Sequence, residues 1–396
     1  MFRNIIYGKK CPYEITSVFS IDVIALMELD VVIVGAGMAG ASLAAQLAGE
    51  CRVLILETER QAGYHSTGRS AALFSEIYGN ACIRALTRAS RSFLFAPPPE
   101  FSETPLVRAR ETVYFARHDQ RDLLSGFRSD TETIELSEGD VRQRLPIFRP
   151  GYLGGAALDP GSADIDVDAL HQGFLRQART RGAMIQTASE VSRLERVSSL
   201  WRVDTANGMF TAPVVVNAAG AWGDALATSA GVRPIGLQPL RRTALLIDPP
   251  AGIPIESWPA AVAVDGSFYF KPDAGALLLS PADEQPSPAC DAQPEEIDVA
   301  IAVDRFERAT DQRVSRVRHR WAGLRVFSAD RSPIVGFDRS AKGFFWLVGQ
   351  GGYGIQTAEA IGRLAAALIL GKEIPDNIKA EGVDETKLSA LRFEHT

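Results

Sequence analysis

The chain has 396 residues, enough for two or three domains of ordinary size. Its 46% hydrophobic and 23% charged residues, with ordinary amounts of glycine and proline, exclude a fibrous or low-complexity protein. The formal net charge of −6 does not favour nucleic acid as a partner. No run of about 18 uncharged apolar residues occurs, so no transmembrane segment is expected. These properties favour a multidomain enzyme with a substantial core.

The four cysteines are scattered along the chain at Cys11, Cys51, Cys82 and Cys290. They form no zinc-type spacing with one another or with histidine, so no metal site is expected. Scattered, reduced cysteines are typical of a reducing compartment, and we expect a cytoplasmic protein.

Residues 1–26 are expected to be an N-terminal extension outside the fold. Their basic residues and the apolar stretch that follows have, superficially, the order of a signal peptide. Asp22 interrupts that stretch, however, and no small-residue cleavage site follows it. Met27 stands just before the first expected strand and is an alternative start of the protein.

The first expected elements form a βαβ unit. A β-branched strand at residues 30–34 is followed by a glycine-rich turn at 35–40, an alanine-rich helix to residue 48 and a second apolar strand at 52–56. Neither strand alternates with polar residues, which is typical of strands buried on both faces. The unit is the beginning of a dinucleotide-binding fold.

The remaining elements suggest two interleaved domains. Helices are expected at 83–95, 168–181 and 354–370, with Gly371 as a C-cap, and buried strands at 214–216 and 343–348. Half-exposed strands are expected at 112–115 and 261–270, and residues 281–294 are expected to form a surface loop. We predict a mixed α/β fold (α+β overall). Its Rossmann-like domain comprises residues 27–97, 155–236 and 325–372, its mainly antiparallel substrate domain comprises residues 98–154 and 237–324, and residues 373–396 form a tail.

The turn Gly35-Ala36-Gly37-Met38-Ala39-Gly40 fits the GxGxxG fingerprint of dinucleotide sites. The three glycines allow the tight turn, the approach of a pyrophosphate and the close packing of helix on strand. Glu57 ends the second strand 22 residues after Gly35, where an acid binds ribose hydroxyls. A tight turn without a ligand is the alternative, and the motif alone does not distinguish NAD from FAD.

A hydroxyl-rich loop at residues 63–72 favours FAD. Ser66, Thr67 and Ser70 supply hydrogen-bond donors for a diphosphate or a flavin, and Arg69 is a candidate countercharge. Here the chain resembles the D-amino-acid oxidase superfamily of FAD-dependent amine oxidoreductases, and within it the bacterial D-arginine and related D-amino-acid dehydrogenases. The shared stretches are residues 63–72, 161–173, 216–222, 268–269, 271–275, 321–325 and 350–357.

The resemblance implies an activity and a site. FAD, bound non-covalently, would accept a hydride at N5 from a D-amino acid, whose imino acid then hydrolyses to the 2-oxo acid and ammonia. The final electron acceptor, a partner molecule or oxygen, stays open. Arg242 and Arg325 would bind the substrate carboxylate, Tyr78 and Tyr269 would line the pocket, and the Gly352 carbonyl would face the amine. The residues expected at the cofactor are Gly35, Gly37, Met38, Ala39, Gly40, Glu57, Thr58, Ser66, Thr67, Arg69, Ser70, Ala71, Val191, Ala218, Gly220, Trp222, Arg325, Gly351, Gly352, Gly354, Ile355 and Gln356.

The sequence departs from the D-arginine enzyme at the substrate. Leu73 stands where that enzyme has a histidine, and either Glu111 or Thr112 takes the place of its guanidinium-binding glutamate. A leucine in the pocket wall favours less polar substrates. Neither a general base nor a metal site is assigned to any of the five histidines. The alternatives are an enzyme for N-substituted amino acids such as sarcosine, proline or opines, a flavin-binding protein without turnover and, third, an NAD-linked dehydrogenase.

Overall fold

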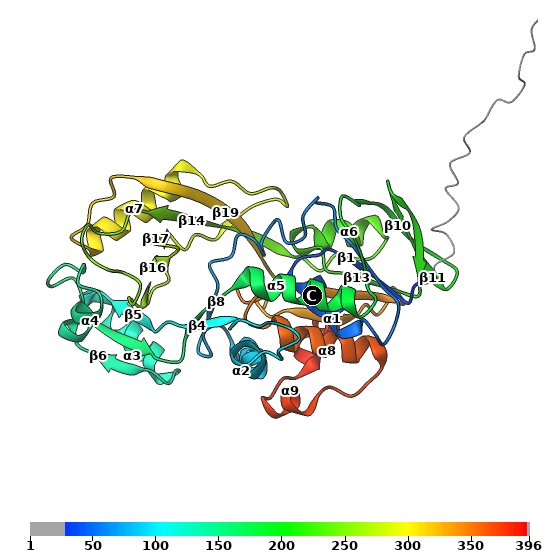
Figure 1. Ribbon diagram of the computed structural model, residues 1–396, viewed down its shortest axis with the longest axis horizontal. Helices are drawn as coiled ribbons and strands as arrows, with labels where there is room; N and C mark the ends of the chain where they lie inside the picture. The colour runs from blue at the N-terminus through cyan, green and yellow to red at the C-terminus, as the bar shows by residue number, and fades with distance from the viewer. Residues whose placement is uncertain (1–27, 394–396) are drawn as a thin grey trace, which may run out of the picture.

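The computed structural model describes residues 28–393, which form two lobes side by side (Figure 1). One lobe is built on a six-stranded sheet and the other on a nine-stranded sheet. Two long paired strands, β14 (Gln238–Ile247) and β19 (Val317–Phe327), run from the second lobe toward the first (Figure 1). The expected extension at 1–26 lies outside the described residues. Within residues 28–393, no helix has the length and apolar character needed to cross a membrane.

The six-stranded sheet has the order β20-β21-β13-β1-β2-β9, and its neighbouring strands are parallel except β20 and β21. These strands are β1 (Val31–Val34), β2 (Val53–Leu56), β9 (Met184–Gln186), β13 (Val214–Asn217), β20 (Ile334–Phe337) and β21 (Phe344–Val348). The carboxyl ends of β1, β2 and β13 therefore meet at one edge of the sheet, which is where such folds bind their ligands.

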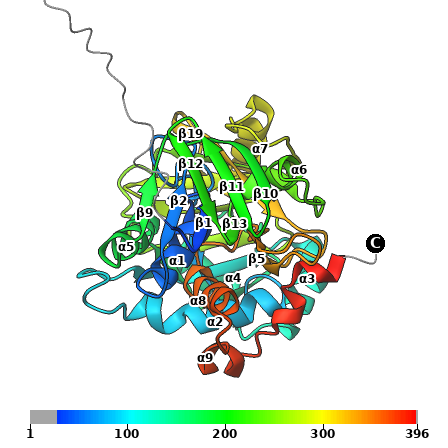
Figure 2. The same ribbon diagram turned by 90° about the vertical axis from the view of Figure 1, so that its right-hand side faces the viewer.

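The central strand β1 is buried on both faces because different elements cover them. Val31 and Ile33 belong to a core shared with the helices α1 (Met38–Leu47), α5 (Val167–Thr180) and α8 (Ala358–Leu370). Val32 and Val34 belong to a second core, which includes the three-stranded sheet of β10 (Val191–Val197), β11 (Leu200–Thr205) and β12 (Gly208–Ala212) (Figure 2). This layering confirms the predicted α/β fold class.

The nine-stranded sheet is mainly antiparallel. Its order is β18-β14-β17-β16-β15-β5-β7-β6, with β19 paired to β14. The strands not yet given are β5 (Thr112–Ala116), β6 (Ile134–Leu136), β7 (Gly155–Asp159), β15 (Ala260–Ala263), β16 (Tyr269–Asp273), β17 (Ala276–Ser280) and β18 (Gln285–Pro286). The helices of this lobe are α3 (Arg121–Ser129), α4 (Glu138–Arg144) and α7 (Glu296–Ala309). Strand β7 lies here, although the sequence division placed residues 155–236 with the nucleotide-binding segments.

Smaller elements join the two lobes. The strands β3 (Leu73–Phe74), β8 (Ala163–Ile165) and β4 (Val107–Ala109) form a three-stranded antiparallel sheet. The helices α2 (Ala81–Phe95) and α6 (Gly223–Ser229) flank the first lobe, and α9 (Asp376–Ala380) follows α8. Ile378 of α9 is fully buried, so the segment after Gly371 packs against the first lobe. The division into domains otherwise stays a prediction.

Three local predictions need correction. The expected strand at 261–270 is two strands, β15 and β16, separated by a turn with a left-handed Gly266. The expected half-exposed strand at 112–115 is fully buried as β5. Val113 and Phe115 pack into the core of the sheet, whereas Tyr114 packs on the opposite side against Phe127 of α3. Helix α8 begins at residue 358 rather than at 354, because residues 351–357 form turns.

Candidate functional site

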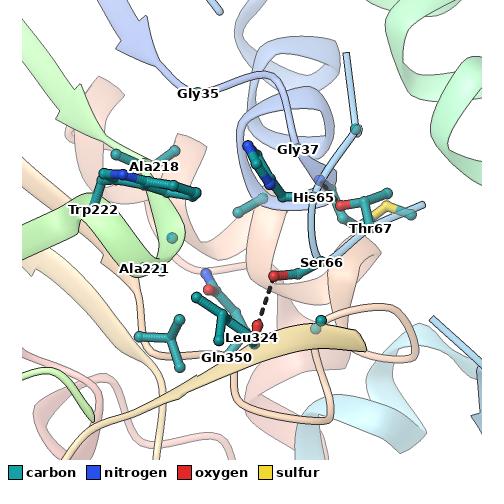
Figure 3. A pocket seen from close by; sticks show the side chains of 18 of the residues that line it. Gly35, Gly37, His65, Ser66, Thr67, Ala218, Ala221, Trp222, Leu324 and Gln350 are labelled. Atoms are coloured by element: carbon teal, nitrogen blue, oxygen red, sulfur yellow. Dashed lines mark hydrogen bonds between the residues drawn. The ribbon is translucent and has the colours of Figure 1, made fainter. Parts of the chain in front are cut away.

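A cavity of about 610 Å³ lies between residues of the two sheets, and most of the predicted site residues line it. Figure 3 shows ten of its residues by label, from Gly35 in the turn after β1 to Gln350 after β21. The predicted residues on its surface are Gly35, Gly37, Met38, Ala39, Glu57, Thr58, Ser66, Thr67, Arg69, Ser70, Ala71, Val191, Ala218, Gly220, Trp222, Arg242, Tyr269, Arg325, Gly351, Gly352, Gly354 and Ile355. Gly40, Tyr78 and Gln356 are the predicted residues that do not line it.

The glycine turn after β1 has the close approaches that its motif implies. A Cβ atom at Gly35 would lie 2.4 Å from the carbonyl oxygen of Ala218, and Gly35 has a φ of +108°. A Cβ atom at Gly40 would lie 1.9 Å from the carbonyl oxygen of Gly35. Gly40 therefore serves the packing of α1 on β1, which is why it lies off the cavity. At Gly37 the nearest atom to a Cβ would be Oγ1 of Thr67, at 3.4 Å, so its backbone borders open space.

Two side chains hold this turn in place at the edge of the cavity. The carboxylate of Glu57 accepts the backbone N–H of Ala36 at 2.8 Å and that of Glu59 at 3.0 Å. Each carboxylate oxygen keeps a lone pair for a ligand hydroxyl. Oγ1 of Thr67 accepts the backbone N–H of Met38 at 2.9 Å, at the first turn of α1. Thr67 thus caps α1, and its own proton remains free to be donated.

The hydroxyl-rich loop is tied to β19. Ser66 donates a hydrogen bond of 2.6 Å to the carbonyl oxygen of Leu324 (Figure 3). Arg69 donates to the carbonyl oxygens of Ala292 and Ala322, and it also forms an ion pair with Asp291. Both Nη atoms are therefore engaged by the protein, and the predicted role of Arg69 as a countercharge at the cofactor stays a prediction. These contacts hold the loop against the second lobe.

Gln356 faces away from the cavity. Its Oε1 atom accepts the backbone N–H of Ser75 at 3.1 Å, and its Nε2 atom donates to Oγ1 of Thr87 at 2.9 Å. The side chain is buried between α2 and the segment after β3. Its predicted contact with the cofactor therefore does not involve the side chain amide, since both ends of that amide are occupied.

Arg242 and Arg325 come together at one end of the cavity. On the paired strands β14 and β19, Arg325 lies opposite Leu240 and Arg242 lies opposite Gly323. Because Arg242 is two residues beyond Leu240, both arginines project from the same face of the sheet. Gly352 lies close to them, since a Cβ atom there would be 2.9 Å from Nη1 of Arg325.

The two guanidinium groups influence each other. Burial lowers the pKa of Arg242, and the charge of Arg325 lowers it further. Burial also acts to lower the pKa of Arg325, but Tyr78 and Tyr269 beside it raise this pKa overall. Arginine stays protonated at neutral pH in either case. Two cations side by side in a buried site favour the binding of an anion.

The two arginines differ in their protein partners. Nε of Arg242 donates to the carbonyl oxygen of Asp283 at 2.7 Å, and Nη2 donates to Glu284 at 3.2 Å. Among the described residues, no carboxylate lies within ion-pair distance of Arg325. Arg325 is therefore the arginine without a carboxylate partner of its own, whereas Arg242 has one in Glu284.

Tyr269 and Tyr78 both lie near Arg325. Tyr269 lines the cavity at the start of β16. Tyr78 lies outside the lining, is 40% exposed, and packs against Tyr353 with ring centroids 4.9 Å apart. Its influence on the pKa of Arg325 shows that it lies next to that guanidinium. Tyr78 therefore lies near Arg325 but outside the lining, whereas the prediction put both tyrosines in the pocket lining.

The residues that distinguish this chain from the D-arginine enzyme lie outside the cavity lining. Leu73 belongs to β3 and is not part of the cavity lining, so the expected leucine in the pocket wall is wrong. Glu111 is partly exposed and lies 3.7 Å from Arg144, and Thr112 is buried and hydrogen-bonded to Ser162. Neither lines the cavity. Every side-chain carboxylate of the lining comes from Glu57, Glu59 or Glu190.

Sequence reasoning also missed some residues of the cavity and one neighbour. His65 packs against the indole of Trp222 with centroids 4.6 Å apart and pairs with Glu59. Gln350 lines the cavity beside the Gly351 turn. Arg241, next to Arg242 in the sequence, pairs with Asp298 and Glu295, and its side chain is only 13% exposed. Apart from Glu59, which is six residues from His65, the partners in these contacts are distant along the chain, so sequence order gives no signal for them.

The comparisons with known proteins agree with this architecture. Residues 30–368 match the family of FAD dependent oxidoreductases. Glycine oxidase of Geobacillus kaustophilus (strain HTA426) is 25% identical over 361 residues, covering 87% of this chain and 93% of that protein. The tRNA 5-methylaminomethyl-2-thiouridine biosynthesis bifunctional protein MnmC of Burkholderia multivorans (strain ATCC 17616 / 249) is 27% identical over 341 residues, covering 77% of this chain and 47% of that protein. The crystal structure of L-proline dehydrogenase from P.horikoshii has a TM-score of 0.78 at 19% identity and covers 93% of this chain and 98% of that chain.

A mixed α/β fold with a glycine turn, a ribose-type acid and a paired-arginine site defines a nucleotide-dependent oxidoreductase. The chain belongs to the family of FAD dependent oxidoreductases. Its relatives include a glycine oxidase and MnmC proteins and do not single out the D-amino-acid dehydrogenases.

The described residues fit FAD. The backbone at Gly37 borders open space in the cavity, and the N-terminus of α1 there favours the negative charge of a pyrophosphate. The carboxylate of Glu57 stands at the rim for ribose hydroxyls. The turn at Gly351 and Gly352 lines the same cavity as Gly35, Glu57 and Arg325, so these residues would all be available to one bound FAD.

Proposed function

We propose that the protein oxidises the carbon–nitrogen bond of an α-amino acid that it binds through the carboxylate. The observation that carries this proposal is the pair Arg242 and Arg325, which project from one face of the sheet into the same cavity that carries the nucleotide-binding turn. A planar guanidinium pairs with a carboxylate through two hydrogen bonds, which fixes orientation as well as position.

Arg325 is the principal anchor in this proposal. It has no ion-pair partner among the described carboxylates, whereas two donors of Arg242 are already engaged by Asp283 and Glu284. Arg242 then adds a second positive charge and a further hydrogen-bond donor for the substrate carboxylate. A carboxylate held at two points fixes the adjacent Cα–H bond relative to the flavin, and such orientation supplies a large part of catalysis.

The remaining groups shape the site around the amine. Gly352 offers a backbone carbonyl with no side chain in the way, and Tyr269 offers a phenol hydroxyl and a ring face. The bound flavin supplies the two-electron acceptor of the reaction. The amino acid loses a hydride from Cα and a proton from its nitrogen, which gives an imino acid that water hydrolyses to the 2-oxo acid and ammonia.

No histidine of the described chain is placed as a general base. His171 is buried and hydrogen-bonded to the carbonyl oxygen of Ala36, and His65 pairs with Glu59. His118 and His319 do not line the cavity. In this proposal the amine therefore reaches the site in its neutral form, so activity rises with pH.

For the substrate class, we propose D-amino acids first. The sequence stretches shared with D-amino-acid dehydrogenases support this choice. The second candidate is a glycine or secondary-amine substrate such as sarcosine or proline. It is supported by the relatives named glycine oxidase and L-proline dehydrogenase.

Anaerobic reduction of the bound flavin tests both candidates. The holoenzyme is mixed with D-leucine, D-phenylalanine, D-arginine, D-proline, L-proline, glycine and sarcosine, and the loss of flavin absorbance is followed. Bleaching by D-leucine or D-phenylalanine but not by L-proline or sarcosine supports the first candidate, and the reverse supports the second. Failure of every amine would contradict the proposed function and favour a flavin protein without turnover. Repeating the active substrates in air with peroxide detection separates an oxidase from a dehydrogenase.

A further inference from the structure

Glu284 connects the substrate end of the cavity with its exterior. Its Oε1 atom accepts a hydrogen bond from Nη2 of Arg242 at 3.2 Å and another from Nη2 of Arg331 at 2.8 Å. Arg242 lines the cavity, whereas Glu284 and Arg331 do not. One carboxylate oxygen is therefore shared between an arginine inside the site and an arginine outside it.

The turn that carries Glu284 is anchored on β14. The carboxylate of Asp283 accepts the backbone N–H of Thr243 at 2.7 Å and its hydroxyl at 3.0 Å. Ala282 has a φ of +53°, in the left-handed region that residues other than glycine rarely adopt. Since neighbouring contacts hold the backbone in this conformation, the side chain of Glu284 is the part of the turn that is able to change its partner.

Arg331 is a second fixed partner for that carboxylate. It also has a left-handed backbone, with a φ of +59°, and its N–H donates to the carbonyl oxygen of Ser328 at 3.0 Å. Its guanidinium lies 3.8 Å from the ring centroid of Phe327. The stacking and the backbone hydrogen bond keep the Arg331 charge at the rim, next to Glu284.

A substrate carboxylate at Arg242 would meet the carboxylate of Glu284. Without ligand, Glu284 offsets part of the charge of Arg242, which is itself crowded by Arg325. Two carboxylates on one guanidinium repel each other, and the hydrogen bond of Glu284 to Arg242 is the longer of its two. Displacing Glu284 from Arg242 while it keeps Arg331 relieves the repulsion without leaving a charge unpaired.

We propose that Glu284 is an internal competitor for Arg242 that sets the affinity of the site for carboxylates, and that Arg331 holds Glu284 when the substrate arrives. This inference rests on the proposed function, because it assumes that a carboxylate binds at Arg242 and Arg325. It makes Glu284 and Arg331 determinants of substrate affinity although neither lines the cavity.

Titration of the holoenzyme with benzoate tests the proposal, because benzoate is a carboxylate without an oxidisable amine. Binding is read from the change in flavin absorbance. The E284Q variant removes the competing charge and should bind benzoate roughly fivefold more tightly. The R331M variant leaves Glu284 on Arg242 and should bind it roughly fivefold more weakly, whereas R331K, which keeps the charge, should restore most of the affinity. If the substitutions acted only by loosening the turn that carries Glu284, both E284Q and R331M would bind benzoate more weakly than the wild type.

A matched ion pair elsewhere provides the control. Arg88 and Glu381 are exposed to about the same extent as Arg331 and Glu284, with side chains 40% and 36% exposed against 45% and 35%. E381Q and R88M should leave the benzoate affinity unchanged. If R325M abolishes benzoate binding but E284Q binds like the wild type or more weakly, the role of Glu284 is overturned and the proposed function stands. If R325M binds benzoate as the wild type does, the carboxylate site itself is wrong and both proposals fail.

Discussion

The hydroxyl of Ser66 donates a hydrogen bond of 2.6 Å to the carbonyl oxygen of Leu324, the residue before Arg325 (Figure 3). This bond joins the loop after β2 in the first lobe to β19 of the second. The loop that lines the cavity and the strand that carries Arg325, the proposed carboxylate anchor, are thus attached directly to each other. A substitution at Ser66 should therefore affect both the loop after β2 and the position of Arg325.

Replacement of Ser66 by alanine should raise KM about threefold to tenfold and lower the stability of the holoenzyme by about 1 kcal/mol, the value of one hydrogen bond. The reason is that the Leu324 carbonyl loses its partner and Arg325 loses part of its positioning. Steady-state kinetics and thermal unfolding measure the two effects. S192A removes a comparable hydroxyl-to-carbonyl hydrogen bond on β10 and should leave KM unchanged. An unchanged KM in S66A would show that the bond does not position Arg325.

Replacement of Arg325 by methionine should raise KM roughly 100-fold, because a charge-assisted, two-point contact with the carboxylate is lost. R242M should have a smaller effect, since two donors of Arg242 already serve the protein. R241M is the control, because Arg241 pairs with Asp298 and Glu295 and does not line the cavity. It should lower stability and leave KM near the wild-type value. Equal KM values in R325M and R241M would contradict the carboxylate site.

Substitutions of two glycines in the turn after β1 should have different effects, one on the packing of the apoprotein and the other on FAD binding. A Cβ atom at Gly40 would overlap the carbonyl oxygen of Gly35, so G40A should destabilise the apoprotein by about 1–3 kcal/mol. At Gly37 a Cβ atom has room in the apoprotein, so G37A should leave its stability near the wild-type value and weaken FAD binding at least tenfold. Urea unfolding of the apoproteins and FAD titration measure the two quantities. Unchanged FAD affinity in G37A would argue against a pyrophosphate at this turn.

His171 should make stability depend on pH. Because the residue is buried, its pKa lies below the ordinary value of 6.5. Its Nε2 atom is hydrogen-bonded to the carbonyl oxygen of Ala36 at 2.9 Å. A pKa lowered in the folded state contributes stability that is complete above pH 6.5 and is lost as the pH falls through the folded pKa. The free energy of unfolding should therefore decrease below pH 6.5, by up to about 1.4 kcal/mol per pH unit from this group.

Urea unfolding at pH 7.5, 6.5 and 5.5 measures this contribution. H171Q keeps an amide donor but no titrating group, so its stability should fall less between pH 6.5 and 5.5 than that of the wild type. H319Q, which changes an exposed histidine of β19, should keep the wild-type dependence. If H171Q and the wild type lose stability in parallel, His171 is not the residue responsible.

The nucleotide half of the site was predictable because it is local. Gly35, Gly37 and Glu57 lie on consecutive elements of one βαβ unit, and their positions follow from the ends of β1 and β2. Arg242 and Arg325 are different, because they are 83 residues apart and meet only through the pairing of β14 with β19. Their assignment came from resemblance to a family rather than from pattern or spacing.

Other differences from the sequence analysis concern contacts between distant segments. Arg69 was expected to be a countercharge for the cofactor, and carbonyl groups of the second lobe engage its guanidinium. Gln356 was expected at the cofactor, but Ser75 and Thr87 hold its amide elsewhere. Strand β5 was expected to be half-exposed because its sequence does not reveal that α3 covers its second face. In each case the deciding partner comes from another part of the chain.

The amino-acid sequence alone was sufficient to establish the apolar strands, the small-residue turn and the dinucleotide-type end of the site, since backbone conformation and short-range periodicity depend on neighbouring residues. Only the folded chain decided which arginine lacks a carboxylate partner and that Glu284 shares its carboxylate between Arg242 and Arg331. The physical reason is that the free energy of a buried charge depends on all the groups around it, and long-range strand pairing brings those groups together.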